Sequence, residues 1–105
     1  MTGERISASL HVIHSADAEA QGLVYPLGDG DTTFGREVDN TVVVTSDQAS
    51  RRHARLLPAP GGHLLQDLGS TNGTFVNSKP IQEQRLRHGD VIRVASTVLK
   101  YVIED

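Results

Sequence analysis

The sequence predicts an all-β fold, and three observations support this prediction. Apolar and polar residues alternate with a period of two over most of the chain, as they do in strands with one buried face. Short apolar or β-branched runs recur about every ten residues. Gly, Pro and Asn residues that favour turns separate these runs, which is typical of a β-sandwich or a barrel.

The elements follow in chain order. In the first strand, Ile6, Ala8, Leu10 and Val12 alternate with polar residues. No window of about twelve residues shows a helical stripe, and Ala16–Ala20 suits a single turn at most. Eight further strands are predicted, at Leu23–Leu27, Thr32–Phe34, Val42–Thr45, Ala54–Leu57, His63–Leu68, Thr74–Val76, Val91–Val94 and Val98–Ile103. The predicted turns lie at 28–30, 58–62, 69–73, 77–80 and 88–90.

The chain of 105 residues has the length of one domain. We expect a flexible tail at residues 1–5 and a single β-sandwich domain at residues 6–105. The absence of cysteine excludes a disulfide framework, a thiolate metal site and a cysteine nucleophile. The sequence shows neither a signal-peptide pattern nor the roughly 18 consecutive apolar residues of a transmembrane helix. It therefore predicts a cytoplasmic protein that does not bind membranes.

The charges are distributed unevenly along the chain. The formal net charge of −3 argues against a general nucleic-acid binder, which needs a basic face for phosphates. Between Asp17 and Asp47 there are seven acidic residues and a single basic one, Arg36. Three arginines and no acid follow between Gln48 and Arg55. An anionic ligand is therefore expected only at a local site.

The first candidate site feature is the pair Gly35 and Arg36. A glycine at the end of a strand allows close backbone approach, and the arginine then projects from a rigid base. Taken alone, the pair is more simply interpreted as a surface arginine after a turn glycine.

The second feature is the sequence Ser50-Arg51-Arg52-His53. A serine and a histidine suggest a hydrolase, but the strained Gly-x-Ser-x-Gly turn is absent, and positions three apart on a strand face opposite ways. A phosphate site uses the same residues better. The Ser50 hydroxyl can donate a hydrogen bond, and Arg36 and Arg51 supply planar sets of donors that match phosphate oxygens.

The third feature is the run of small polar residues from Gly69 to Thr74. Asn72-Gly73 between two apolar runs is a strong hairpin signal, so a tight turn is one interpretation. The other is a recognition loop, because the Thr71 hydroxyl, the Asn72 amide and the backbone can bind an extended peptide.

Metal and nucleotide sites have no support in the sequence. His11 and His14 lie three apart on a predicted strand, and no carboxylate stands at a zinc-ligand spacing from them. Neither GxxxxGK[ST] nor GxGxxG occurs. We expect no cofactor and no catalytic residue.

Four motifs, in this order and spacing, resemble the forkhead-associated (FHA) domain. They are Phe34-Gly35-Arg36, Ser50-x-x-His53, Ser70-Thr71-Asn72-Gly73-Thr74-Phe75-Val76-Asn77 and Leu86-x-x-Gly89-Asp90-x-Ile92. The resemblance covers about residues 23–103. It implies an eleven-stranded β-sandwich, antiparallel in type, whose loops at one end bind phosphothreonine peptides.

The resemblance also implies roles for individual residues. Arg36 and Ser50 would contact the phosphate, with Arg51 beside them in a position that is often polar or basic in the family. Thr71 and Asn72 would hold the peptide, Asn72 through the peptide main chain. The residues with a structural role would be Gly35, His53 and Gly73.

The sequence departs from the family pattern in two places. The glycine that commonly follows the strand after Ile92 is replaced by Val94-Ala95-Ser96, and Gln48 stands where some relatives carry a charged selector residue. The function implied is recognition of a phosphothreonine-containing protein downstream of a Ser/Thr protein kinase, without catalysis. The alternative is a scaffold domain that binds partners independently of phosphate.

Overall fold

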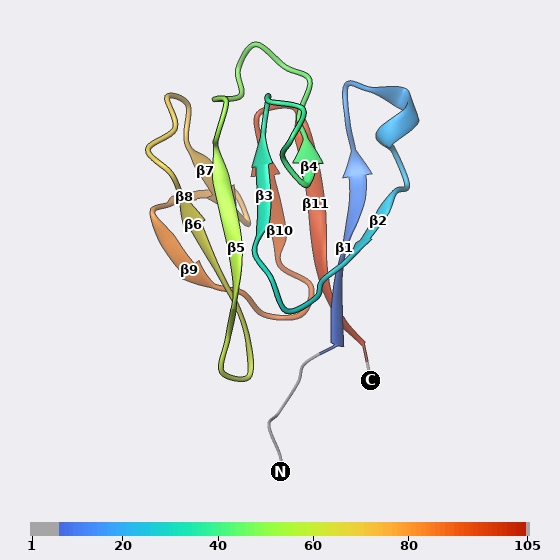
Figure 1. Cartoon of the computed structure of the whole chain (residues 1–105), viewed down its shortest axis with the longest axis vertical. Coiled ribbons are helices and arrows are strands. Elements are labelled where there is room, and N and C mark those ends of the chain that lie inside the picture. The colour runs from blue at the N-terminus through green and yellow to red at the C-terminus, as the bar shows by residue number, and fades with distance from the viewer. Residues whose placement is uncertain (1–6, 105) are drawn as a thin grey trace.

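The computed structural model describes residues 7–104, which form two packed β-sheets (Figure 1). The tail expected at residues 1–5 lies outside the described residues. One sheet has six strands in the order β2-β1-β11-β10-β7-β8, and the other has five in the order β4-β3-β5-β6-β9. The strands are β1 (Ser7–His14), β2 (Val24–Pro26), β3 (Thr32–Gly35), β4 (Val42–Val43), β5 (Ala54–Ala59), β6 (Gly62–Asp67), β7 (Thr74–Val76), β8 (Lys79–Ile81), β9 (Glu83–Arg85), β10 (Val91–Val94) and β11 (Thr97–Glu104).

The prediction of an all-β sandwich with eleven strands is confirmed. All strand pairs are antiparallel except β3 and β4, which run parallel and which a loop rather than a tight turn therefore joins. The short turn expected within Ala16–Ala20 is a 3₁₀ helix at Ala18–Ala20, and the Asp17 side chain caps it. Among the described residues, no helix is long and apolar enough to cross a membrane.

The core lies between the two sheets and follows the alternation read from the sequence. Leu10, Phe34, Leu65, Ile92 and Leu99 have no exposed surface, and each comes from a different strand. Their polar neighbours along each strand face away, as the period of two requires. Burying such side chains contributes roughly 1.5–3 kcal/mol each, so the sandwich provides a rigid frame for its loops.

Three loops meet at one end of this frame, seen at the top of Figure 1. They are the 36–41 loop between β3 and β4, the 44–53 loop between β4 and β5, and the 68–73 loop between β6 and β7. The turn between β5 and β6 lies at the opposite end (Figure 1). The hairpin interpretation of Asn72-Gly73 is wrong, because β6 and β7 belong to different sheets and the 68–73 loop crosses between them.

Candidate functional site

The 44–53 loop is fixed to the sandwich at both of its ends. Val44 and Ala49 are buried, and the Val44 N–H donates to the Gly35 carbonyl at 2.8 Å. The Arg36 N–H donates to the Ser50 carbonyl at 3.0 Å. The backbone of Arg36 is thereby held beside Ser50, although 14 positions separate them in the sequence.

His53 joins the 44–53 loop to the 68–73 loop. Its side chain is completely buried, its Nδ1 atom accepts the Ser50 N–H at 3.1 Å, and its Nε2 atom lies 2.8 Å from the Gly73 carbonyl oxygen. A backbone N–H can only donate, so Nδ1 is unprotonated and Nε2 carries the proton that is donated to Gly73. Both hydrogen bonds therefore depend on one neutral tautomer of His53.

The same geometry gives His53 no part in activating Ser50. The argument from strand geometry does not apply to this pair, because residues 51–52 form a bend and β5 begins at Ala54, where the strand was predicted to begin. His53 contacts the Ser50 backbone rather than its hydroxyl, and both ring nitrogens are occupied. The Ser50 hydroxyl has no base among these contacts.

Two further hydrogen bonds connect the loops at their exposed rim. The Ser50 Oγ atom accepts the Thr71 N–H at 3.2 Å, and the Asn72 Nδ2 atom donates to the Gln48 carbonyl at 2.8 Å. Ser50, Thr71 and Asn72 are consequently assembled before any ligand is present.

The arginines of this region differ in how they are engaged. Within residues 7–104, the guanidinium groups of Arg36 and Arg51 make no ion pair or hydrogen bond, and both side chains are exposed. Arg52 pairs with Asp39 at 2.6 Å and also contacts Asn40. Two cationic groups therefore remain available beside Ser50, while the third is used within the protein.

An FHA domain family model matches residues 32–95, more than half of the chain and the segment that holds the three loops. The chain belongs to the FHA domain family. The resemblance inferred from the four motifs is thereby confirmed.

Relatives and solved structures agree with this membership. The FHA domain-containing protein FhaB of Mycolicibacterium smegmatis is 40% identical over 80 residues, which span 75% of this chain and 52% of that protein. The chain thus spans about half of this relative, and a smaller share of several others.

Among solved structures, an FHA domain from a study of phosphothreonine-dependent FHA interactions matches with a TM-score of 0.81 and 34% identity, covering 94% of this chain and 98% of that one. Mycobacterium tuberculosis EmbR in complex with a low-affinity phosphopeptide matches with a TM-score of 0.84 and 33% identity, covering 97% of this chain and 26% of that one.

The FHA fold of this chain uses two supporting residues that the sequence analysis missed. Asn40 is buried, and its Nδ2 atom donates to the carbonyls of Glu37 and Arg51, both at 2.9 Å. Asp67 accepts from the Ser70 and Thr74 hydroxyls at 2.5 and 2.7 Å and from the Gly69 and Ser70 N–H groups at 3.1 Å. Asn40 thus holds the 36–41 loop against the 44–53 loop, and Asp67 shapes the 68–73 loop.

Of the structural residues, Gly35 has a steric reason for its identity. A Cβ atom there would lie well inside contact distance of the Arg51 carbonyl oxygen and 2.8 Å from Asn40 Nδ2. We expect Gly35→Ala to destabilise the FHA domain by about 2–3 kcal/mol, because backbone would have to move. Gly28→Ala is the matched control, since nothing lies within 4 Å of its added Cβ. Equal denaturation midpoints for the two variants would contradict this steric account.

The environment of the Asp67 carboxyl group should make the folding stability of the domain sensitive to acid. Burial acts to raise the pKa of its carboxyl group, but hydrogen bonds from Ser70 and Thr74 outweigh this and lower the pKa below the ordinary 3.8. A lowered folded-state pKa gives stability that is present above the ordinary pKa and is lost as pH falls through the folded value. Urea unfolding from about pH 7 to about pH 3 should show this loss.

Two variants isolate the contribution of Asp67 to that profile. The Asp67→Asn variant should be less stable at neutral pH by about 1–3 kcal/mol. Its free energy of unfolding should also fall less on acidification, so that the acid limb of the stability profile becomes flatter. Asp47→Asn, at an exposed position, should leave the profile unchanged. An acid limb that is the same in the Asp67→Asn variant would refute the assignment.

Proposed function

We propose that the three loops bind a phosphothreonine of a partner protein, without chemical conversion. The observation that carries the proposal is the arrangement around Ser50. The Arg36 N–H is bonded to the Ser50 carbonyl, Arg51 follows Ser50 in the chain, and both guanidinium groups lack a partner within residues 7–104. Hydrogen bonds already join Ser50 to Thr71 and Asn72 to Gln48 at the rim of the loops. A phosphothreonine carries about −1.5 to −2 charges and three acceptor oxygens at neutral pH, which suits this set of donors.

Each of these site residues has a donor or acceptor that its contacts within the protein do not occupy, and this group would contact the ligand. Arg36 and Arg51 would pair with the phosphate. The Ser50 oxygen already accepts the Thr71 N–H, so its own proton is free to be donated to a phosphate oxygen. The Asn72 Nδ2 atom is engaged with Gln48, which leaves Oδ1 as an acceptor for a peptide N–H. The Thr71 hydroxyl would contact the peptide beside it.

The two similar FHA structures reported above support this proposal. One of the similar FHA structures comes from work on phosphothreonine-dependent interactions, and another contains a phosphopeptide. We place the binding module at residues 6–105 and its action in the cytoplasm, where a Ser/Thr kinase would generate the ligand. The activities of any longer protein that contains this module would be additional to the binding proposed.

The decisive experiment is calorimetric titration with one peptide in four forms: phosphothreonine, phosphoserine, glutamate and unmodified threonine. We expect micromolar affinity for phosphothreonine, since three or four charge-assisted hydrogen bonds offset the cost of association. The phosphoserine peptide should bind at least about tenfold more weakly than the phosphothreonine peptide, because it lacks one methyl group. The glutamate and unmodified peptides should not bind measurably. A degenerate peptide library that shows no phosphate dependence would instead indicate a scaffold domain.

Asn72 provides a test of the peptide-binding rim. Asn72→Ala removes both the proposed acceptor for the peptide and the bond to Gln48, so we expect affinity to fall about tenfold. Asn72→Asp keeps an acceptor but adds a negative charge near the phosphate, and it should bind more weakly still. A dissociation constant that neither substitution alters would argue against this assignment.

A further inference from the structure

The six-stranded sheet has a charge opposite to that of the chain as a whole. Its strands contain Lys79, Arg93 and Lys100, and Glu104 is the one acidic residue among them. Lys79 is opposite the buried Val76, so of the three cations only Arg93 and Lys100 lie on the outer surface of the sheet. The six strands therefore carry a formal charge of +2, against −3 for the whole chain. The remaining residues consequently carry −5.

Arg93 occupies a defined position on the outer surface of this sheet. Its neighbours on β10, Ile92 and Val94, are buried, so Arg93 points away from the core. Its guanidinium carbon lies 4.2 Å from the centre of the Phe75 ring, a stacking contact that orients the group. No carboxylate among the described residues pairs with it.

Apolar side chains surround this cation. Val98 is directly opposite Arg93 on β11, and Val91 is opposite Lys100, which is also exposed and unpaired within residues 7–104. The outward positions of a solvated sheet face normally hold polar residues, whereas here half-buried valines alternate with cations.

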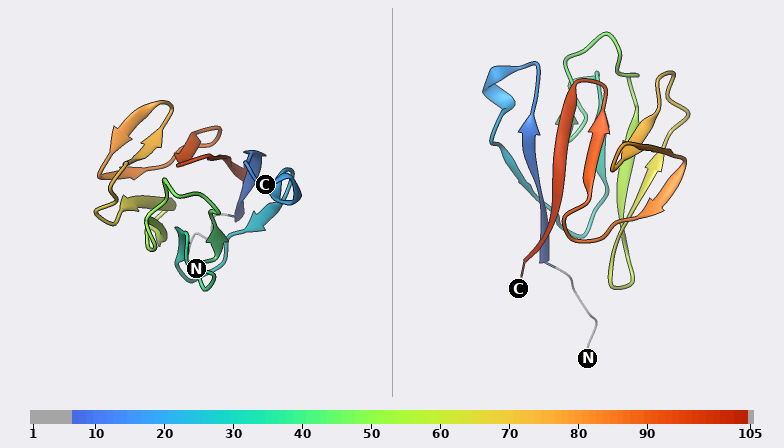
Figure 2. Two further views of the ribbon diagram at one scale, coloured as in Figure 1. Left: turned by 90° about the horizontal axis from the view of Figure 1, so that it is seen from above. Right: turned by 180° about the vertical axis from the view of Figure 1, so that it is seen from behind.

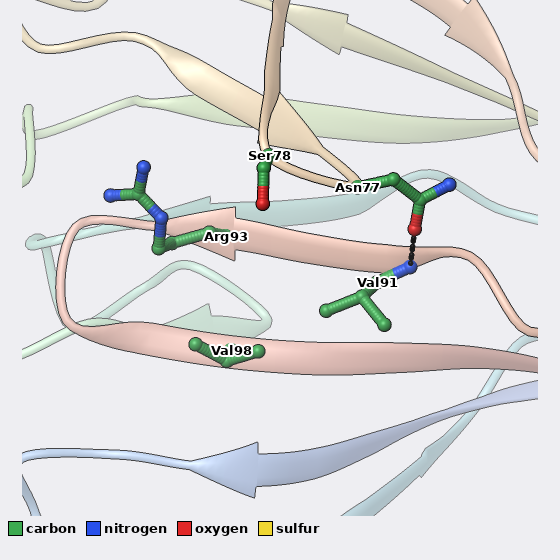
Figure 3. Close-up of a pocket in the computed structure, with 5 residues that line it drawn as sticks. All are labelled: Asn77, Ser78, Val91, Arg93 and Val98. Atoms are coloured by element: carbon green, nitrogen blue, oxygen red, sulfur yellow. Dashed lines mark hydrogen bonds between the residues drawn. The ribbon is translucent and has the colours of Figure 1, made fainter.

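A hollow of about 500 Å³ lies beside Arg93. Figure 3 shows Val91 and Val98 below this hollow and the 77–78 turn above it. The Asn77 Oδ1 atom accepts the Val91 N–H at 3.0 Å, which holds this turn against β10. The Ser78 hydroxyl points towards the hollow (Figure 3). The hollow thus combines an apolar floor, a hydroxyl and an unpaired cation.

We propose that this surface, the β10 face formed by Phe75, Val91, Arg93, Val98 and Lys100, docks an acidic and aliphatic segment of a partner protein. Carboxylates would pair with Arg93 and Lys100, and an aliphatic side chain would enter the hollow between them. Nucleic acid fits less well, because only two cations are present and valines lie between them. A second copy of this chain would have to bind the β10 face with a different, acidic part of its own surface. Contacts between two different surfaces repeat from copy to copy and favour open chains over a closed dimer.

The β10 face is separate from the loop end. It lies on the broad side of the six-stranded sheet, turned towards the viewer in the right panel of Figure 2, whereas the loops lie at the top. Docking here requires no phosphate and goes beyond the proposed function. It would add affinity to phosphothreonine binding when one partner reaches both surfaces.

The test uses an unphosphorylated, end-capped peptide of alternating Glu and Val, titrated into the ¹⁵N-labelled chain. We expect binding near millimolar affinity that weakens with salt, with amide shifts at Val91, Arg93, Val98 and Lys100 and none at Arg36, Ser50 or Thr71. Arg93→Glu and Lys100→Glu should each weaken binding at least about fivefold. Arg87→Glu makes the same charge change at an exposed position outside the sheet and should have little effect.

Several results would overturn the proposal. A peptide with Lys in place of Glu should not bind, and equal binding would remove the electrostatic basis. Unchanged affinity in both charge-reversal variants would also refute it. Larger shifts at the same amides with a short DNA duplex or with phosphatidylserine vesicles would show a different class of ligand. Self-association that competes with the peptide would indicate a contact between copies.

Discussion

Replacing Arg36 with alanine is expected to remove measurable binding of a phosphothreonine peptide while leaving the domain folded. The guanidinium is exposed and makes no contact within residues 7–104, so its loss costs little stability. Its proposed paired hydrogen bonds to phosphate contribute about 3 kcal/mol or more, which corresponds to a loss of about a hundredfold or more. Calorimetry and thermal unfolding of the same sample would measure both effects.

Two other substitutions make the Arg36 result specific. Arg52→Ala removes the same charge nearby, but Arg52 is engaged with Asp39, so affinity should change by only a few fold. Arg36→Lys keeps the charge and loses the planar arrangement of donors, so it should bind at an intermediate level. An Arg36→Ala protein that is folded and binds normally would exclude the proposed phosphate site.

Replacing His53 with alanine is expected to cost about 3–5 kcal/mol of folding free energy. The substitution leaves a cavity in a completely buried position, and it leaves the Ser50 N–H and the Gly73 carbonyl without their partner. Phosphopeptide affinity should also fall, because the two loops are no longer held together. Denaturant unfolding and calorimetry would report the two effects separately.

Smaller changes keep the His53 test informative if the alanine variant does not fold. His53→Asn can still accept the Ser50 N–H, and His53→Gln can still donate to Gly73, so each should lose only part of the stability. His14→Ala, at an exposed position on β1, is the control. A His53→Ala protein as stable as this control would contradict the bridging role.

The sequence could predict the strands that contribute to the core. Nine of the eleven coincide with predicted apolar or β-branched runs, and on β1 the alternation of Leu10 and Val12 with polar residues matches their burial. The missed strands are β8 and β9, each of which forms one edge of its sheet; the other two edge strands, β2 and β4, were predicted. β8 contains Pro80, and β9 is wholly polar. Such residues protect an edge strand from pairing with another chain, and they also remove the alternation of apolar residues from which a strand is predicted.

The residues of the candidate site also fall into those that the sequence could predict and those that it could not. Arg36, Ser50 and Asn72 could be selected because their chemistry and order resemble a known family. Asn40 and Asp67 could not be selected, since in the sequence Asn40 looks like an ordinary turn residue and Asp67 like a polar residue of the predicted strand His63–Leu68. Their importance comes from contacts with carbonyls and hydroxyls of other loops, and these exist only after the sandwich has brought the loops together.

The pairing of Ser7 with Glu104 has a practical consequence for how this module can be presented. These residues form the last pair of the β1–β11 ladder, so the described chain enters and leaves the sandwich at one place. That place is at the bottom of Figure 1, opposite the three loops. A fused domain, an affinity tag or a sensor surface attached through either terminus would leave the loops facing solvent. Immobilised and fused forms should therefore bind ligand as the free chain does.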